Sequence, residues 1–371
     1  MRKNSNRSTM RRARTALSAA VAACVVTVLP NGAAAETTAV EGVAGDAGAG
    51  VERISVAPDG TQADDHSTGA SITPDGRHIV FASSAQNLTS DPPTAGDRVF
   101  VRDQRTARTR QLGNLTPLQP PVISGDGAYL AYPVQWITNV RVRLYQVATG
   151  ATAAVNCLAY SCNQPSMNGD GRYTAHVVYF NSPSPGQRVE VQDSNTGAKE
   201  LIATFGHTAS SRPSISGDAR YVAYQDAQAK DVYVWDRTTA TASGPLEGPS
   251  MAATLVQLSD DGRKVVYLSG TDTYVHDLTA GTAQLVPNVR GVAIDPTGRY
   301  LLYAPHDPDA PSLTLRDLHT GTDETVSTQP ATAGTDAVSS GGRDVVFHST
   351  ADDIVPDDTN NKSDIFVRHY Y

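Results

Sequence analysis

The strongest candidates for acid–base chemistry are histidines near carboxylates in predicted loops. His306 is followed by Asp307 and Asp309, and His207 lies in a second predicted loop. A histidine titrates near neutral pH, and a nearby carboxylate can orient its ring, so such a group can move a proton during hydrolysis or elimination. These four residues are the catalytic candidates if the chain is a lyase or hydrolase. The alternative is that they are ordinary solvated loop residues.

A cluster of oxygen-bearing side chains occupies residues 352–364. Asp357, Thr359 and Asn361 alternate along this segment, and Asp364 closes it. Calcium takes about six to eight oxygen ligands, so the segment is a candidate calcium loop, although it lacks the mid-loop glycine and terminal glutamate of an EF-hand. Asn and Asp also hydrogen-bond their own backbone in turns, which explains the composition without a metal. No other cofactor is predicted.

The cysteines indicate a disulfide. Cys24 falls in the apolar start of the chain, whereas Cys157 and Cys162 are separated by only four residues in one predicted connection. We predict that these two form a bond across that short loop. The alternative, a redox pair or half of a metal site, does not fit the spacing.

Other catalytic patterns are sparse. The nine histidines are scattered, and no two of them have the spacing of a zinc motif. The sequence contains no Gly-x-Ser-x-Gly segment of the kind that carries a nucleophilic serine. The sequence therefore favours binding over catalysis.

The elements that would position these residues come from a pattern that recurs seven times between Ser71 and Tyr371. Each copy has an apolar stretch, an Asp-Gly-Arg-like turn and two β-rich stretches with period-two alternation. Counted at the turn glycine, or at Ala219 in the fourth copy, the spacings are 51, 44, 48, 43, 36 and 44 residues. Four-stranded propeller blades have this period. The predicted fold class is all-β, a single seven-bladed β-propeller.

The two ends of the chain are predicted to meet. The seventh copy stops without an outer strand, and residues 51–56 resemble the outer strands of the other copies. Pairing these segments would close the ring and leave no open sheet edge between first and last blades. The expected organisation is a signal peptide at 1–35, a flexible leader at 36–50 and the propeller at 51–371.

Aspartates recur at the ends of the second β-rich stretches. Because a unique site rarely needs so many copies, we interpret them as structural residues that cap turns. They are Asp103, Asp193, Asp236, Asp277 and Asp317.

Two segments carry a family resemblance. Residues 214–224 (Ser-Ile-Ser-Gly-Asp-Ala-Arg-Tyr-Val-Ala-Tyr) and 364–368 (Asp-Ile-Phe-Val-Arg) resemble the WD-like repeats of TolB-type propellers. The resemblance extends over nearly all of 51–371 and implies a propeller that acts as a recognition surface or as part of a larger protein. This chain lacks the α/β domain that precedes the propeller in TolB, and no peptidase domain follows, so neither specific role carries over.

Ligands of propellers usually bind at the rim that holds the outer-to-inner connections and the loops between second and third strands. Here that rim is predicted to carry Asp226, the histidine-bearing loops and five further candidates that suit recognition of a peptide or glycan. These five are Trp136, Tyr179, Phe180, Arg212 and Arg290.

The first 35 residues predict export. A basic start, an apolar run and Ala33-Ala34-Ala35 before Glu36 have the form of a signal peptide. Six of the 30 basic residues lie in this segment, which leaves 24 against 38 acidic ones, or about −14 for the mature chain. An acidic surface repels phosphate backbones, so no nucleic-acid partner is expected. No later apolar run is long enough to span a bilayer.

We therefore expect a secreted or extracytoplasmic, monomeric propeller that recognises a protein, peptide or glycan without catalysis. The alternative is a small secreted lyase or hydrolase that uses a rim histidine and a carboxylate.

Overall fold

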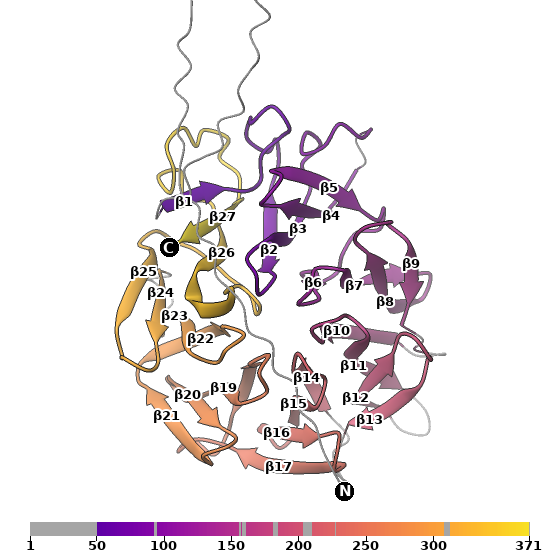
Figure 1. Cartoon of the computed structure of the whole chain (residues 1–371), viewed down its shortest axis with the longest axis vertical. Coiled ribbons are helices and arrows are strands. Elements are labelled where there is room, and N and C mark those ends of the chain that lie inside the picture. Colours follow the sequence, from indigo (N-terminus) through magenta and orange to yellow (C-terminus); the bar gives the residue numbers. More distant parts are fainter. Residues whose placement is uncertain are drawn as a thin grey trace, which may run out of the picture. The chain divides into compact units, whose positions relative to one another are not determined.

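The computed structural model describes residues 50–92, 95–155, 157, 161–180, 185–202, 210–226, 228–307 and 312–370. These residues belong to one compact unit in which seven small sheets surround a central axis (Figure 1). The predicted single seven-bladed, all-β propeller is confirmed. A 3₁₀ turn, η1 at Ser340–Gly342, is the only helical element in the described part of the chain. The expected signal peptide and nearly all of the leader lie outside the described residues.

Each of the first six blades is an antiparallel sheet whose four strands follow chain order from the axis outward. Blades 1 to 3 comprise β2 (Ser67–Ile72), β3 (His78–Ser83), β4 (Arg98–Asp103) and β5 (Arg108–Leu112); β6 (Val122–Ile123), β7 (Tyr129–Trp136), β8 (Asn139–Gln146) and β9 (Thr152–Ala154); and β10 (Ser161–Met167), β11 (Tyr173–Phe180), β12 (Gly186–Asp193) and β13 (Lys199–Ile202). Blades 4 to 6 comprise β14 (Ser210–Ile215), β15 (Tyr221–Asp226), β16 (Asp231–Asp236) and β17 (Thr241–Leu246); β18 (Thr254–Leu258), β19 (Lys264–Ser269), β20 (Asp272–Asp277) and β21 (Thr282–Val286); and β22 (Val289–Ile294), β23 (Tyr300–Pro305), β24 (Leu313–Asp317) and β25 (Asp323–Ser327).

Blade 7 closes the ring with strands from both ends of the chain. The order is β26 (Asp344–Ser349), β27 (Asp364–His369) and β1 (Gly50–Arg53), with β1 antiparallel to β27. The predicted closure is confirmed, but β1 is shorter than the predicted 51–56 and begins one residue earlier. The predicted innermost strand of this blade, near residues 336–339, is reduced to single bridges such as Val338 with Val345.

Aromatic residues on the second and third strands fill the space between blades. Four blades place two such rings directly opposite each other, with centroids 5.4 to 5.8 Å apart. Cross-strand aromatic pairs stabilise a sheet and bury a large apolar area. The four pairs are Phe81 with Phe100, Tyr224 with Tyr233, Tyr267 with Tyr274, and Phe347 with Phe366.

Blade 3 departs from this pattern. His176 lies at the position that holds Tyr or Phe in the other blades, and Glu190 is its cross-strand neighbour. His176 is fully buried, and burial lowers the pKa of its imidazole to about 4. Its Nδ1 lies 3.3 Å from the carbonyl oxygen of Thr174, so Nδ1 is the donor if the two bond. This histidine is a packed structural residue.

Glycine is required at the first position of the Gly-Asp-Gly turns, because the backbones of neighbouring blades come into close contact there around the axis. The amide of Gly169 donates to the carbonyl of Gly217 at 2.9 Å, and that of Gly217 donates to Asp260 at 2.8 Å. A Cβ on Gly169 would lie 2.9 Å from the Gly217 carbonyl oxygen, and one on Gly125 would lie 3.2 Å from the Cα of Gly169. Larger residues would therefore push neighbouring blades apart.

The recurring strand-end aspartates cap the following turns, as predicted, and each also pairs with a basic residue of the first turn in its own blade. Asp193 accepts the Asn195 amide at 2.8 Å and the Arg172 guanidinium at 2.8 Å, and the arginine bond lowers the pKa of this carboxyl to about 2. The residues therefore tie two turns of one blade together. The equivalent pairs are Arg77 with Asp103, Arg220 with Asp236, Lys264 with Asp277, and Arg299 with Asp317.

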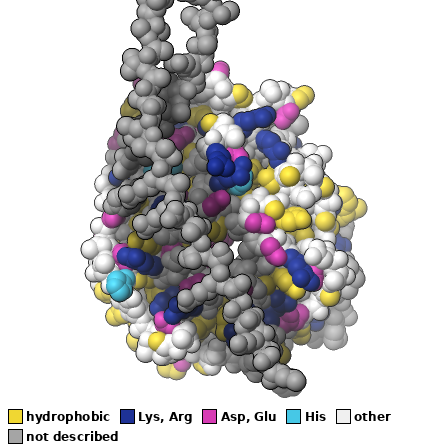
Figure 2. Space-filling model, in the orientation of Figure 1, with side chains coloured by type: hydrophobic (Ala, Val, Ile, Leu, Met, Phe, Trp, Pro, Cys, Tyr) yellow, Lys and Arg dark blue, Asp and Glu magenta, His cyan; other side chains and the backbone are white. Residues whose placement is uncertain are grey.

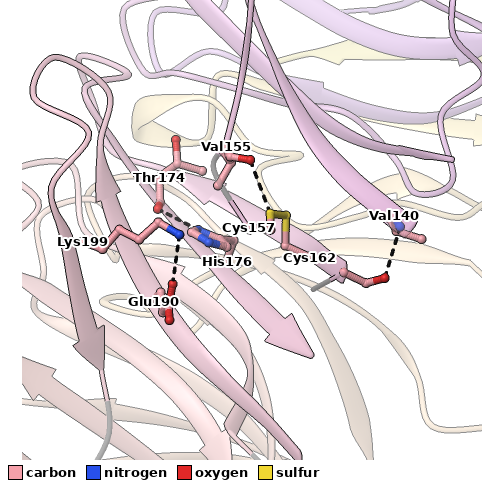
Figure 3. Close-up of a disulfide and its surroundings, with 9 residues drawn as sticks. Val140, Val155, Cys157, Cys162, Thr174, His176, Glu190 and Lys199 are labelled. Carbon is pink, nitrogen blue, oxygen red and sulfur yellow. Dashed lines mark hydrogen bonds and ion pairs between the residues drawn. A yellow bond between two sulfur atoms is a disulfide. The ribbon is translucent and has the colours of Figure 1, made fainter. Parts of the chain in front are cut away.

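Cys157 and Cys162 form the predicted disulfide, with their Cα atoms 5.9 Å apart (Figure 3). Both are buried in a cluster between blades 2 and 3 that includes Ala131, Leu144 and Val178. The bond therefore fixes the connection from β9 to the inner strand β10.

Replacing both cysteines by alanine is expected to lower the free energy of unfolding by about 2 kcal/mol, since the bond closes a small loop and restrains the unfolded chain only modestly. Urea unfolding under oxidising conditions measures this. A reductant should bring the wild-type protein to the same stability and leave the double variant unchanged. An unaltered wild-type curve in reductant would contradict a stabilising bond.

Candidate ligand-binding site

A cavity of about 470 Å³ opens at the predicted rim, beside the inner strands of blades 4 to 7. It brings together four of the rim candidates, Arg212, Arg290, His306 and Asp307. A smaller cavity of about 220 Å³ adjoins it and shares Arg290 and His306. We call this pair of cavities the rim pocket. His207 and Asp309 lie outside the described residues.

Both arginines of the rim pocket are placed by irregularities in inner strands. The register of β14 shifts between Ser211 and Ser214, and Arg212 lies in this bulge with a φ of 49°. Its amide donates to the Oε1 of Gln164 in blade 3 at 2.8 Å. Arg290 precedes a similar shift in β22. Bulges re-aim side chains next to binding sites, which accounts for the position of Arg212.

The rim pocket carries two arginines and two aspartates, Arg212, Arg290, Asp272 and Asp307, and part of its wall is apolar. The Arg212 and Arg290 side chains are exposed, and neither guanidinium bonds to a described residue. The walls include Leu255, Leu268 and Val292. Such a site can take a ligand that carries an anionic group on a partly apolar body.

His306 and Asp307 follow β23 and are both exposed. The main-chain amide of His306 donates to Asn288 at 3.2 Å, whereas no hydrogen bond or ion pair joins its ring to a described residue. The structure therefore brings the predicted pair to the cavity without showing the oriented imidazole that an acid–base catalyst needs.

The aromatic rim candidates lie apart from this pocket, on blades 2 and 3. Trp136 is 44% exposed, and the guanidinium of Arg143 lies 4.3 Å from its ring. Arg188 lies 5.3 Å from the ring of Phe180, and Tyr179 is half-buried beside it. Asp226 accepts the amide of Gln228 and caps the turn after β15. The predicted rim set is thus divided between two parts of the ring.

The central channel is nearly closed. A cavity of only about 30 Å³, room for one or two water molecules, lies among the inner strands. Gln257 donates to the Asp336 carboxylate there at 2.7 Å, and burial raises the pKa of Asp336 to about 6. Burial, together with the charge of Asp336, raises the pKa of Asp260 to about 7. The central channel is therefore too small to hold anything larger than water molecules.

The candidate calcium loop is held against the N-terminal segment by direct hydrogen bonds. The buried Asp364 accepts from Ser55 at 2.5 Å and from Asn360 at 2.9 Å, and Arg53 lies 3.7 Å from it. Gln62 bonds the backbone on both sides, accepting from the Thr359 amide at 3.2 Å and donating to the Asp357 carbonyl. These contacts explain the polar composition. Calcium binding by Asp357, Thr359, Asn361 and Asp364 stays a prediction.

The described residues contain no group of three or more His, Cys, Asp or Glu side chains arranged to hold a metal. No helix among them is long and apolar enough to cross a membrane. Figure 2 shows acidic and basic side chains interspersed over the visible face of the ring.

No protein-family model and no curated protein matches the sequence. Solved structures do match. An oligogalacturonate lyase in complex with manganese aligns at a TM-score of 0.65 and 14% identity, covering 87% of this chain and 94% of that one. The oligogalacturonate lyase of Vibrio parahaemolyticus gives 0.64 and 13%, covering 86% and 93%. TolB from Acinetobacter baumannii gives 0.47 and 14%, covering 70% and 62%. At these identities the two lyase matches show a shared propeller fold and no more.

Proposed function

We propose that the protein is an exported recognition module that binds a peptide or glycan in the rim pocket without transforming it. The observation that carries the proposal is the convergence of Arg212, Arg290 and His306 on one cavity of about 470 Å³. A concave site with an apolar floor and a few polar groups is the usual form of a ligand site. The disulfide and the signal-like start support export.

The two arginines suggest that the ligand is anionic. Each offers a planar array of donors suited to a carboxylate, and neither is neutralised by a described residue. The predicted mature chain is acidic overall, so two exposed arginines at one cavity are a specific feature of this site. Trp136, Tyr179 and Phe180 remain candidate contacts for a ligand long enough to reach blades 2 and 3.

The alternative is a propeller enzyme. The fold shared with oligogalacturonate lyases, whose named substrate is an acidic glycan, and the two pocket arginines motivate it. The described metal-donor residues of the rim pocket are His306, Asp272 and Asp307, and they form no group arranged to hold a metal, so this donor set does not fit a manganese centre. We derive no step through a metal. In this reading His306 would act as the acid–base group with Asp307 or Asp309.

Replacing Arg212 and Arg290 by glutamine is expected to weaken binding of an oligogalacturonate about tenfold or more, because two charge-assisted contacts are lost. Isothermal titration of the wild-type and variant proteins measures this. The matched control is Arg263→Gln, an exposed arginine at the opposite end of blade 5. The methyl ester of the same glycan should bind poorly to every form.

The same mixtures of protein and oligogalacturonate also distinguish a binding module from an enzyme. Shortened glycan products, formed by the wild-type protein and lost in His306→Ala, would support the enzyme and overturn the non-catalytic proposal. Binding that is equal in all variants would place the ligand elsewhere. If the oligogalacturonate does not bind, acidic peptides are tested with the same variants.

A further inference from the structure

A second cavity lies on the outer flank of blade 1, away from the rim pocket. It has a volume of about 590 Å³ and runs along β5, the outermost strand of this blade. Val56, Pro58 and residues 88–91 form one wall, and the turn at residues 148–150 of blade 2 contributes another. Figure 1 shows β5 at the periphery of the ring, between β1 and the β8–β9 hairpin. We call this cavity the β5 groove.

The floor of the β5 groove is an unpaired sheet edge. β5 pairs with β4 on its inner side, and among the described residues no second strand pairs with it. The hydroxyl of Tyr132 on β7 donates to the carbonyl of Leu112, the last residue of β5, at 3.3 Å. An open edge presents alternating amide and carbonyl groups at the spacing of an extended chain. This pattern matches a peptide backbone, whereas a glycan has no equivalent row of donors and acceptors.

The positive charge of the groove favours a peptide with acidic side chains. Arg102, Arg108 and Arg110 line it, against one carboxylate, Asp91. Arg108 and Arg110 are two residues apart and therefore project from the same face of β5, about 7 Å from each other. No other outer strand in the described ring carries two arginines.

Arg102 is a buried arginine with unused bonding capacity. Its side chain lies on the opposite face of the blade, paired in register with Thr109, and is only 7% exposed. One terminal nitrogen donates to the Ala107 carbonyl at 2.7 Å, but its Nε has no partner in the described chain. A buried donor without an acceptor is costly, so this group points to a ligand or ordered solvent in the groove.

We propose that the β5 groove binds an extended peptide that adds a fifth strand to blade 1 and carries acidic side chains at alternate positions. The peptide backbone pairs with the free edge of β5. Its acidic side chains lie beside Arg108 and Arg110. The site is separate from the rim pocket and does not depend on the function proposed for it.

Fluorescence anisotropy with a labelled hexapeptide of alternating glutamate and valine tests the proposal. The purified protein should bind this peptide, and its affinity should fall as the salt concentration is raised. Two altered peptides, one with glutamine for glutamate and one N-methylated at alternate amides, should bind about tenfold more weakly or worse. Arg108→Gln/Arg110→Gln should give the same loss.

Matched variants guard against misfolding. Arg105→Gln, in the adjacent turn but outside the groove, should bind normally. Arg108→Gln alone removes no hydrogen bond or ion pair between this side chain and a described residue, whereas Arg110 also donates to the Val147 carbonyl of blade 2. Amide hydrogen exchange should show protection of residues 108–112 when the glutamate peptide is bound.

Several results would overturn the proposal. Equal binding of the glutamine peptide would mean that charge is not recognised, and equal binding of the N-methylated peptide would mean that the edge is not used. Protection at the rim pocket instead of β5 would assign the peptide to that site. The absence of binding at millimolar peptide would also reject it.

Discussion

The Phe366→Ala variant is expected to unfold with a free energy about 3 to 5 kcal/mol below that of the wild-type protein. Phe366 is fully buried, and its ring stacks on Phe347 with centroids 5.6 Å apart. It lies on β27, which pairs with β26 on one side and with β1 on the other. Truncation therefore leaves a cavity where the two ends of the chain meet, and the ring cannot close around it without strain.

Urea unfolding followed by circular dichroism measures the loss. Phe366→Leu, which keeps most of the buried volume, should lose much less than the alanine variant. The surface control is Leu285→Ala on β21, where the side chain is 49% exposed, and its effect should stay within about 0.5 kcal/mol. A Phe366→Ala protein as stable as this control would contradict the packing described for blade 7.

The fold was predictable because each blade repeats its own local signals. The Gly-Asp-Gly turns set the blade period, and Gly125 and Gly169 are needed where neighbouring backbones touch. The role of strand-end aspartates such as Asp193 was also predictable from their recurrence. Their pairing with Arg172 and its equivalents was not predicted, although the joint recurrence of turn arginine and strand-end aspartate was a visible signal.

The candidate site was predictable only in part. Position along a strand predicts which rim a residue occupies, and Arg212, Arg290 and His306 line one cavity, while their role in binding stays a prediction. It does not predict which blades contribute to one cavity, so Trp136 was grouped with residues that lie elsewhere on the ring. The β5 groove was missed because its walls come from residues 56–58 and 148–150, and only ring closure brings these segments to β5.

The free energy of unfolding is expected to fall as the pH rises from about 6.5 to 9, because His369 loses its proton. This residue lies on β27, where the two ends of the chain pair. The Nδ1 of His369 lies 2.8 Å from Asp344, and its Nε2 lies 3.8 Å from Glu52 of β1. The hydrogen bond to Asp344, and then the nearby carboxylate of Glu52, raise the pKa of the imidazole to about 9. In the unfolded chain this group titrates near 6.5.

The direction of this pH dependence follows from whether the folded or the unfolded state holds the proton of His369. Below about pH 6.5 both states carry it and the stabilisation is complete, whereas between 6.5 and 9 only the folded state does, so raising the pH favours unfolding. A shift of this size corresponds to at most about 3 kcal/mol, and less after solvent screening of the partly exposed ring. Urea unfolding at pH 6.5 and 9 measures the difference.

The His369→Gln variant isolates the contribution of this group. It should be less stable than the wild-type protein at pH 6.5, and the two should converge at pH 9, whatever other residues titrate in that range. Because His369 joins β27 to Glu52 on β1, the loss should also appear as faster amide exchange in residues 50–53 at high pH. A stability difference that stays constant with pH would show that the histidine contributes by packing and that its charge does not hold the ring closed.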